Sequence, residues 1–445
     1  MAGGTWDTQN KVRPGVYIRF TSNQANTLTV GDRGVVAICE PLSWGPVAQV
    51  MEVEAGADTT PFTGYPASDP HNRFLTEIFK GSNRTPAPKK VLLFRPTADS
   101  AVKATVAIGT LTATAVYPGA RGNDISVVVT ELTEPSGSFQ VSTVVDGTVV
   151  DQQVGKNVAD LKPNAWVTWS GSGALTADTG KSLATGADGN VQAAAYTAFL
   201  TAIEPLQFDV LIYDGSDSTT LTAMQSFIKR INREEGKYAQ LVAAGMTDPD
   251  SYSVINVASG VLLDDGTALT PQQTTWWAGG ATAGARFFDS LTYAKYPGAV
   301  EVSPKITNSA IIKALEAGSF VLQSDDGAVK VEQDINTQVT VTPDISRAYR
   351  KNRVIRTLFT IARDVYAQWS NGFIGVVDNN ADGRLLFKGS IVGYLLEIQA
   401  NNGIKNFSAD DVTVEPGGDI DAIVVTIGIQ PVDAVEKVYV TIAIN

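Results

Sequence analysis

The sequence predicts an α+β protein of several domains: an α/β core, an all-β module inserted into it, and a C-terminal α+β domain, with extended arms at both ends. Strand and helix patterns alternate over residues 29–96 and resume over 191–335, as in α/β domains. Between them, residues 97–190 change to short alternating runs, and beyond 335 two helical patterns precede a group of strands. We therefore divide the chain as follows: 1–28, N-terminal arm and linker; 29–96 plus 191–335, α/β domain; 97–190, β-rich module; 336–430, C-terminal α+β domain; 431–445, C-terminal arm.

The first predicted element is an extended arm in the stretch KVRPGVYIRF. Val16, Ile18 and Phe20 alternate with Tyr17 and an arginine, and this period of two predicts a strand over about 13–20. The polar run TSNQANT follows it and is typical of a linker. The arm is therefore expected to be joined to the core by a flexible connection.

The α/β core begins with short strands and one helix. In SDPHNRFLTEIFKG, Asp69 can cap a helix that has Pro70 at its first position and Gly81 at its end. The strand pattern VLLFRP follows. After residue 190, NVQAAAYTAFLTAIE and a helix over 218–235 alternate with the strand patterns QFDVLIYD and YAQLVAAG. We infer one α/β domain that the β-rich module interrupts.

The inserted module consists of short strand patterns separated by turns. Its runs TVAIGTLTATAV, DISVVVTEL, SFQVSTVVDGTVV and AWVTWSG are bounded by Gly, Pro and Asn. Such spacing predicts a small β-sandwich or barrel.

The C-terminal domain begins with a strongly amphipathic helix in RVIRTLFTIARDVYAQW. Its apolar residues fall within one arc of a helical wheel: Ile355, Leu358, Phe359, Ala362, Val365, Tyr366 and Trp369. A second helix, over about 384–400, follows the turn NNADG, and the strands DVTVEP and IDAIVVTIGIQ come next.

The chain ends in a strand pattern, VEKVYVTIAIN, after the short break PVDA. Val438, Val440, Ile442 and Ile444 share one face, and nothing follows to cover the edge of this strand. An uncovered apolar edge invites pairing with another chain. The strand either folds back into its own sheet or is donated to a neighbouring molecule.

Charge and composition exclude some classes of function. The chain has 445 residues, a formal net charge of -12 and a pI near 4.7, which argues against general nucleic-acid binding and against adherence to anionic membranes. No stretch approaches the roughly 18 apolar residues of a membrane span, and the first residues lack the pattern of a secretory signal. We expect a protein that is made and folded in the cytoplasm, without direct membrane insertion.

The residues that most enzymes and metal sites require are scarce. Cys39 lies in a buried-strand pattern and His71 in the capped helix, so the chain has one cysteine and one histidine for zinc sites and for Cys/His or Ser/His/Asp catalysis. GGATAGAR has the glycine spacing of a phosphate loop but Ala285 where lysine is required, and it lies in a helical pattern. Close helix packing through small residues explains this stretch better.

A calcium loop is likewise unsupported. DNNADG matches its first half, but the twelfth position is Gly389 instead of a carboxylate, and Arg384 adds positive charge. A polar turn between helices explains the stretch. We therefore predict no catalytic residues, no metal and no cofactor.

One basic feature contrasts with the acidic chain. Arg350, Arg353 and Arg356 follow one another at a spacing of three and predict a stripe opposite the apolar arc. The stripe is either a solvated helix face or a docking surface for an acidic partner.

Four stretches in order along the chain resemble a known family: GGTWDTQNKVRPGVYIRF, YPGARGNDISVVV, SLTYAKYPGAVEVSP with IIKALEAGSFVL, and VEKVYVTIAIN. They resemble the tail sheath proteins of contractile phage tails, especially the shorter sheaths of Gram-positive phages, defective prophages and phage-tail-like bacteriocins. The resemblance implies a structural protein without an active site, in which the α/β domain forms the sheath core. It also implies assembly in the bacterial cytoplasm into stacked rings that contract and drive an inner tube through a cell envelope.

The resemblance further implies partners and site residues. The partners are other copies of the chain, the inner tail tube, the baseplate and the tail terminator, with no nucleic acid. In such sheaths the two terminal extensions add strands to sheets of neighbouring subunits. Carried over to this sequence, the donated residues are Val16, Tyr17, Ile18, Phe20, Val438, Val440, Ile442 and Ile444.

Because the third domain of such sheaths lies nearest the tube, Arg350, Arg353 and Arg356 become candidates for tube docking. Two other classes stay open. One is an α/β enzyme with an unrecognised site and a carbohydrate-binding β module. The other is a surface adhesin or shell protein, although the sequence has no sorting signal to favour it.

Overall fold

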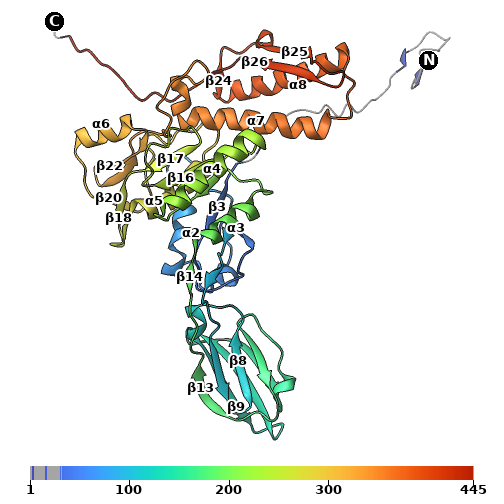
Figure 1. Ribbon diagram of the computed structural model, residues 1–445, viewed down its shortest axis with the longest axis vertical. Helices are drawn as coiled ribbons and strands as arrows, with labels where there is room; N and C mark the ends of the chain where they lie inside the picture. The colour runs from blue at the N-terminus through green and yellow to red at the C-terminus, as the bar shows by residue number, and fades with distance from the viewer. Residues whose placement is uncertain (1–2, 5–15, 18–30, 32, 444–445) are drawn as a thin grey trace. The chain divides into compact units, whose positions relative to one another are not determined.

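The computed structural model describes residues 3–4, 16–17, 31 and 33–443, and the chain divides into two compact units (Figure 1). The larger unit contains residues 31–363 and 431–445, and the smaller one contains 364–430 together with 1–30. Within the described ranges, no helix combines the length and the apolar character that crossing a membrane requires.

A seven-stranded sheet forms the centre of the larger unit, in the order β21-β17-β16-β15-β3-β5-β4. All neighbours are parallel except β4, which runs antiparallel to β5 at one edge. The central strands are buried on both faces, so they read as continuous apolar runs such as QLVAA. The bounds are β3 Val35–Cys39, β4 Val50–Glu54, β5 Lys90–Phe94, β15 Val210–Ile212, β16 Gln240–Ala244, β17 Val254–Val257 and β21 Ser319–Phe320.

Helices cover both faces of this sheet, giving three layers (Figure 1). On one face α2 (Arg73–Ile78) and α5 (Pro271–Gly284) pack on Val36 and Ile38 of β3. On the other, α3 (Ala193–Ile203) and α4 (Ser218–Glu234) pack on Ala37 and Cys39. Alternate residues of one strand therefore serve two separate cores. The α/β prediction is confirmed, and Cys39 is a buried strand residue.

The glycines of α5 allow close packing, as the sequence predicted. A Cβ atom on Gly280 would lie 2.0 Å from the carbonyl oxygen of Ile78, and one on Gly279 would lie 2.5 Å from the side chain of Ile212. The helix therefore sits against α2 and β15 at a distance that larger residues would prevent. GGATAGAR is a packing motif in this fold.

Smaller elements complete the α/β part. They are α1 Thr60–Thr63, η1 Pro70–Asn72, α6 Asn308–Glu316, η4 Arg347–Arg350, the sheet β19-β18-β20 (Ala268–Leu269, Gly260–Leu263, Ala299–Ser303) and the hairpin β22-β23 (Leu322–Asp325, Ala328–Val331).

The inserted module is a β-sandwich, which confirms that prediction. Its sheets have the orders β11-β10-β9-β13 and β12-β8-β7. β6 (Ala98–Asp99) and β14 (Asn190–Val191) pair antiparallel where the chain enters and leaves it. The remaining bounds are β7 Thr105–Ile108, β8 Leu111–Ala115, η2 Ala120–Asp124, β9 Ile125–Leu132, β10 Ser138–Val145, β11 Thr148–Gly155, η3 Val158–Asp160, β12 Val167–Gly171 and β13 Asp178–Ser182.

One residue of the α/β part is built into the core of the sandwich. Trp44 lies in the loop after β3, yet it is buried beside Tyr117 and Trp166, with ring centroids 5.3 and 4.9 Å away. Arg95, at the end of β5, donates to the carbonyl oxygens of Gly45 and Pro118. The sandwich is therefore packed onto this loop.

The smaller unit contains two helices and a β-hairpin. α7 spans Asn352–Gly372 and enters this unit at Asp364, and α8 spans Ala381–Ala400. β25 (Val412–Pro416) pairs antiparallel with β26 (Ile423–Ile427), and Tyr394 of α8 donates to Asp364 at 2.7 Å. The two predicted helices, joined by the turn NNADG, are confirmed, and Asn380 caps the N-terminus of α8. The short elements are β24 Ile404–Lys405, η5 Ala409–Asp411 and β27 Gln430–Pro431.

The terminal elements are described only in part. Of the predicted N-terminal strand, the structure describes Val16–Tyr17, which form β2 and pair parallel with β1 (Gly3–Gly4). The predicted linker 21–27 lies outside the described residues, as do Ile18, Phe20 and Ile444. Residues 435–443 lie in no strand. A strand needs a hydrogen-bonded neighbour, and the single chain gives this segment none among the described residues.

Candidate functional site at the C-terminal segment

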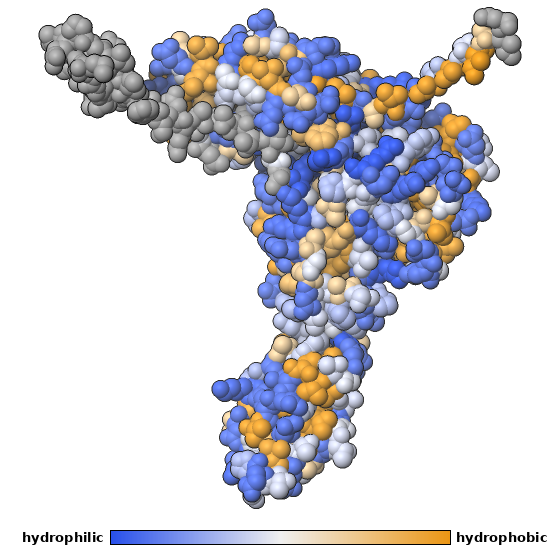
Figure 2. Space-filling model, turned by 180° about the vertical axis from the view of Figure 1, so that it is seen from behind, coloured by the Kyte–Doolittle hydropathy of each residue, from blue (hydrophilic) through white to orange (hydrophobic). Residues whose placement is uncertain are grey.

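The segment before the C-terminus exposes its apolar side chains on both faces. Val438, Val440 and Ile442, predicted to share one face, are 76, 75 and 84 % exposed, and Tyr439 on the other face is 90 % exposed. Figure 2 shows this segment as a run of mainly hydrophobic residues that leads to the grey end of the chain. Contiguous exposed apolar residues mark an interaction site more often than isolated ones do.

The root of this segment is fixed to the larger unit by charged groups. Thr292 Oγ1 donates to Glu436 Oε1 at 2.9 Å, and Lys351 forms an ion pair with the same carboxylate. Lys351 Nζ also lies 3.7 Å from Asp433, and burial raises the pKa of the Asp433 carboxyl. The stretch PVDA, which the sequence predicts as a short break before the final strand, is therefore held at its aspartate.

The partners of Glu436 rest on a buried polar network. Asp334 accepts hydrogen bonds from Asn352 Nδ2 at 3.0 Å and pairs with Arg356 at 2.5 Å, and Arg356 also donates to the carbonyl oxygen of Asp289 at 2.8 Å. Arg356 and Asp334 are 0 and 2 % exposed. A buried pair of opposite charges keeps its geometry because either charge alone would be costly to bury.

The predicted arginine stripe is wrong as a surface feature. Arg356 is completely buried, and Arg350 donates to the carbonyl oxygen of Leu315. Arg353 is half-buried, and burial lowers the pKa of its guanidinium. The first half of α7 is enclosed by the larger unit, so the face opposite the apolar arc is also covered there. Arg356 has no surface to offer to a tube; a tube contact by Arg350 or Arg353 stays a prediction.

The hairpin of the smaller unit has the features of a strand acceptor. β25 and β26 form a two-stranded sheet, and Val424 of β26 is 54 % exposed. β25 packs against α8, with Val412 fully buried, and the edge of a two-stranded sheet can accept a further strand. The sequence identified both strands, but it could not show that their sheet stops at two.

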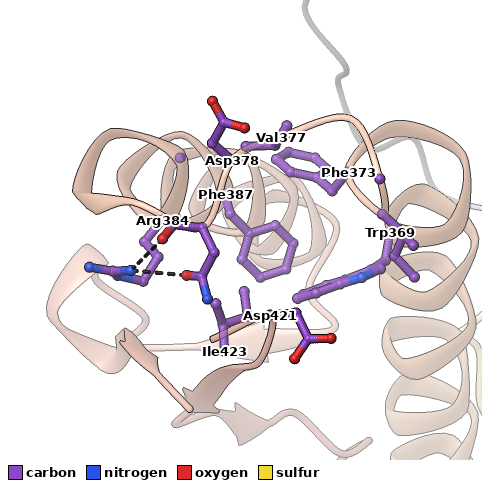
Figure 3. Close-up of a pocket in the computed structure, with 12 residues that line it drawn as sticks. Trp369, Phe373, Val377, Asp378, Arg384, Phe387, Asp421 and Ile423 are labelled. Atoms are coloured by element: carbon purple, nitrogen blue, oxygen red, sulfur yellow. Dashed lines mark hydrogen bonds between the residues drawn. The ribbon is translucent and has the colours of Figure 1, made fainter. Parts of the chain in front are cut away.

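A cavity of about 330 Å³ lies beside this hairpin, between the end of α7 and the start of α8 (Figure 3). Its floor is aromatic: the ring of Phe387 lies 4.2 Å from that of Trp369 and 5.0 Å from that of Phe373. At the rim, Arg384 donates to the side-chain oxygen of Asn379 at 2.9 Å. The cavity suits an apolar group, and its rim contains no pairing of a nucleophile with a base.

A carboxyl pair occupies the position where α/β enzymes usually bind ligands. Glu40 and Asp214 follow β3 and β15, the adjacent strands from which the chain proceeds in opposite directions across the sheet. The two carboxyls are hydrogen-bonded, and burial raises the pKa of both. Trp276 Nε1 donates to Asp214 at 2.8 Å. With Glu40 only 8 % exposed, the pair is part of the core.

The cysteine and the histidine both pack against neighbouring residues of the fold. Burial raises the pKa of the Cys39 thiol. His71 stacks on Tyr65 at 4.1 Å and lies 2.7 Å from the Asp69 carboxylate. Among the described residues, no three His, Cys, Asp or Glu side chains gather in a way that could hold a metal ion.

Comparisons with known proteins place phage tail sheath domains along the chain. Residues 98–188 match the family model of the phage tail sheath protein beta-sandwich domain, 189–337 the central domain and 344–445 the phage tail sheath C-terminal domain. The chain is 33% identical over 474 aligned residues to protein XkdK of the phage-like element PBSX of Bacillus subtilis, and the match covers 100% of both.

Solved structures give the same result. The crystal structure of a sheath tail protein from Desulfitobacterium hafniense is 41% identical, covers 96% of this chain with 99% of its own and superposes with a TM-score of 0.87. The helical sheath of the anti-feeding prophage in its contracted state covers 97% of this chain with 99% of its own, at 14% identity and a TM-score of 0.58. The second likeness concerns the fold alone.

Proposed function

Because this chain belongs to the phage tail sheath protein family and is a structural sheath subunit, we propose that it polymerises helically around an inner tube by exchanging strands between neighbouring subunits. We further propose that the assembled sheath contracts and drives the tube through a target cell envelope. The baseplate and the tail terminator are the other proposed partners. Assembly takes place in the bacterial cytoplasm under this proposal, and no step needs an active site.

The exposed apolar segment 435–443 is the observation that supports strand exchange most directly. Its alternating pattern is that of a strand, while the described part of the same chain supplies no neighbouring strand. In water such a segment gains little from being ordered alone, because fixing its backbone costs conformational entropy. Pairing with a sheet of another copy supplies both backbone hydrogen bonds and apolar burial.

The hairpin β25–β26 of a neighbouring copy is the acceptor that we propose. It has two strands and partly exposed apolar residues, and a third strand can extend its sheet by backbone pairing. The donor residues are Val438, Val440 and Ile442, together with Ile444 beyond the described range. Val16 and Tyr17, with Ile18 and Phe20, form the proposed second donor at the other end of the chain. Donor and acceptor are different surfaces, so the contact propagates instead of closing on itself.

Contraction can proceed without a nucleotide. We propose that the extended sheath is a metastable state, held behind a kinetic barrier, and that contraction leads to more favourable contacts between subunits. The exchanged strands keep neighbouring subunits connected while the subunit bodies move.

The test compares the full-length chain with a version that ends at Ala434, by negative-stain electron microscopy and analytical sedimentation. The full chain should form striated hollow tubes, and the shortened chain should stay a folded, small species. V440D should act like the truncation. V154D is the matched control, because Val154 is also exposed but lies on the sandwich, and this variant should assemble normally. Tubes formed by the shortened chain would refute strand exchange by the C-terminal segment.

A further inference from the structure

Two carboxylates at the root of the C-terminal segment are bound by two residues of the same subunit. Lys351 and Thr292 contact Glu436, and Lys351 also lies near Asp433. We call these four residues the clasp. The side chains of Glu436, Lys351 and Asp433 are 10, 22 and 30 % exposed. Ion pairs that are partly shielded from water are stronger than those on open surface.

The residues that bind Glu436 are themselves held in place by hydrogen bonds within the larger unit. Thr292 Oγ1, while donating to Glu436, accepts the backbone N–H of Asp334 at 3.0 Å. Asp334 in turn accepts the backbone N–H of Leu291 at 3.0 Å and holds the buried Arg356. Lys351 directly precedes α7, and its backbone forms a bridge with Ile335. Both cationic and hydroxyl partners of Glu436 therefore have fixed backbones.

The residues just beyond the clasp have very different surroundings. Val438 and Tyr439 are 76 and 90 % exposed, whereas the Glu436 side chain is 10 % exposed. Val435, between the two clasped carboxylates, is already 84 % exposed, so the clasp holds the side chains of Asp433 and Glu436 and leaves the apolar side chains of the segment open to solvent.

We propose that Lys351 and Thr292 are positioning residues for assembly: by holding Asp433 and Glu436, they fix where the donated strand leaves its subunit and in which direction. This inference rests on the proposed strand exchange. The proposed donor residue Ile444 is eight residues beyond Glu436, and at about 3.3 Å each an extended segment of this length reaches roughly 26 Å from a fixed origin. A fixed origin raises the effective concentration of the strand at one acceptor and lowers it elsewhere. The neighbour that receives the strand is thus selected by the root as well as by the strand itself.

The clasp can be tested in the isolated subunit with spin labels. V438C and A310C place one label on the segment and one on the exposed helix α6, and the natural Cys39 is buried. Pulsed electron–electron double resonance then gives the distribution of distances between the two spin labels. We expect a narrow distribution in the parent, a distribution at least twofold broader with K351M, and a narrow one again with K351R, which keeps the charge.

The control is E301Q, which breaks the exposed ion pair between Glu301 and Lys305 without touching the clasp. It should leave the distribution unchanged. Circular dichroism should show that K351M keeps its fold, and E436Q provides a second variant if it does not. In assembly, K351M should raise the concentration needed for tube formation at least fivefold, and K351R should restore it.

Equal widths in the parent, in K351M and in E436Q would overturn the clasp. This outcome is independent of the truncation at Ala434: if the shortened chain assembles, strand exchange is refuted, whereas the label distances still decide whether the root is held. If truncation abolishes assembly but K351M assembles like the parent, strand exchange stands and the positioning role is refuted.

Discussion

At the scale of single residues, the buried charges of this protein were the hardest features to predict. Arg356 lies at helical spacing from Arg350 and Arg353, and periodicity alone placed all three on one polar face. The pairing of Arg356 with Asp334, 22 residues away, depends on a tertiary contact that no local pattern contains. By contrast, Cys39 within an apolar run was predictable, because strand burial follows from the run itself.

Removing Asp334 should strongly destabilise the larger unit. D334A leaves the Arg356 guanidinium buried without its counter-charge, which should cost about 3–5 kcal/mol of unfolding free energy. Urea denaturation followed by tryptophan fluorescence measures this loss. D325A is the control: Asp325 is exposed in its pair with Lys330, so the change should stay within about 0.5 kcal/mol. Equal effects of both variants would argue against a structural role of the buried pair.

The carboxyl pair of Glu40 and Asp214 predicts a pH dependence. Burial raises the pKa of the Glu40 carboxyl, so between the ordinary and the raised pKa the folded chain holds a proton that the unfolded chain has released. The stabilisation is therefore complete below the ordinary carboxyl pKa and is lost as the pH rises through the raised value. For one proton, the unfolding free energy should fall by up to about 1.4 kcal/mol per pH unit in that window.

E40Q should flatten this decline, because glutamine remains neutral and can still donate to Asp214. Urea unfolding at a series of pH values gives the slope. E52Q, in the exposed pair of Glu52 with Lys90, is the control and should keep the parent's slope. A parent-like slope in E40Q would assign the pH dependence to other groups.

At the scale of elements, the sequence predicted the strand and helix types well, since periods of 2 and 3.6 persist over whole segments. It also predicted that α5 packs closely through its glycines. It could not predict how Trp44 is used, because a single tryptophan in a loop carries no sign of the domain whose core it joins. The clasp was missed for the same reason: Glu436 and Lys351 are 85 residues apart.

Gly280 and Gly393 should respond oppositely to alanine. A Cβ on Gly280 would collide with the backbone oxygen of Ile78, so G280A should destabilise despite the better helix propensity of alanine. Gly393 of α8 has nothing within 4 Å of the corresponding position, and G393A should stabilise by about 0.5–1 kcal/mol. Thermal unfolding of both variants tests the pair of signs. A destabilising G393A, or a neutral G280A, would contradict the packing seen around these helices.

Deleting the sandwich should succeed only if Trp44 is changed as well. Removing residues 100–189 would expose Trp44, which is 2 % exposed in the intact chain. We expect the deletion alone to aggregate, and the deletion with W44S to be soluble and folded, as judged by size-exclusion chromatography and circular dichroism. If both deletions are equally soluble, Trp44 contributes little to the junction.

At the scale of the whole molecule, the proposed donor and acceptor lie in different units of one chain. The segment beyond Glu436 belongs to the larger unit and the hairpin β25–β26 to the smaller one. Each copy can therefore give a strand and receive one. The family resemblance carried this assignment, since the sequence alone left open whether the strand returns to its own sheet.

Two complementary defects should yield small complexes instead of tubes. A chain that ends at Ala434 can receive a C-terminal strand but cannot donate one, and V424D, on the exposed side of β26, should donate but not receive. Mixed in equal amounts, they should form short, finite complexes, whereas each alone should stay unassembled. Sedimentation distinguishes these species. Tubes in the mixture would show that subunits assemble without an unbroken series of exchanged strands.

β6 and β14 form a two-residue ladder at the junction between the sandwich and the α/β domain. Ala98–Asp99 and Asn190–Val191 lie side by side, so the sandwich leaves and rejoins the α/β domain at almost one point. A domain inserted in this way can be acquired, lost or replaced by recombination without changing the register of any strand in the seven-stranded sheet. In a descendant that had lost the sandwich, position 44 is where selection should have replaced tryptophan with a polar residue.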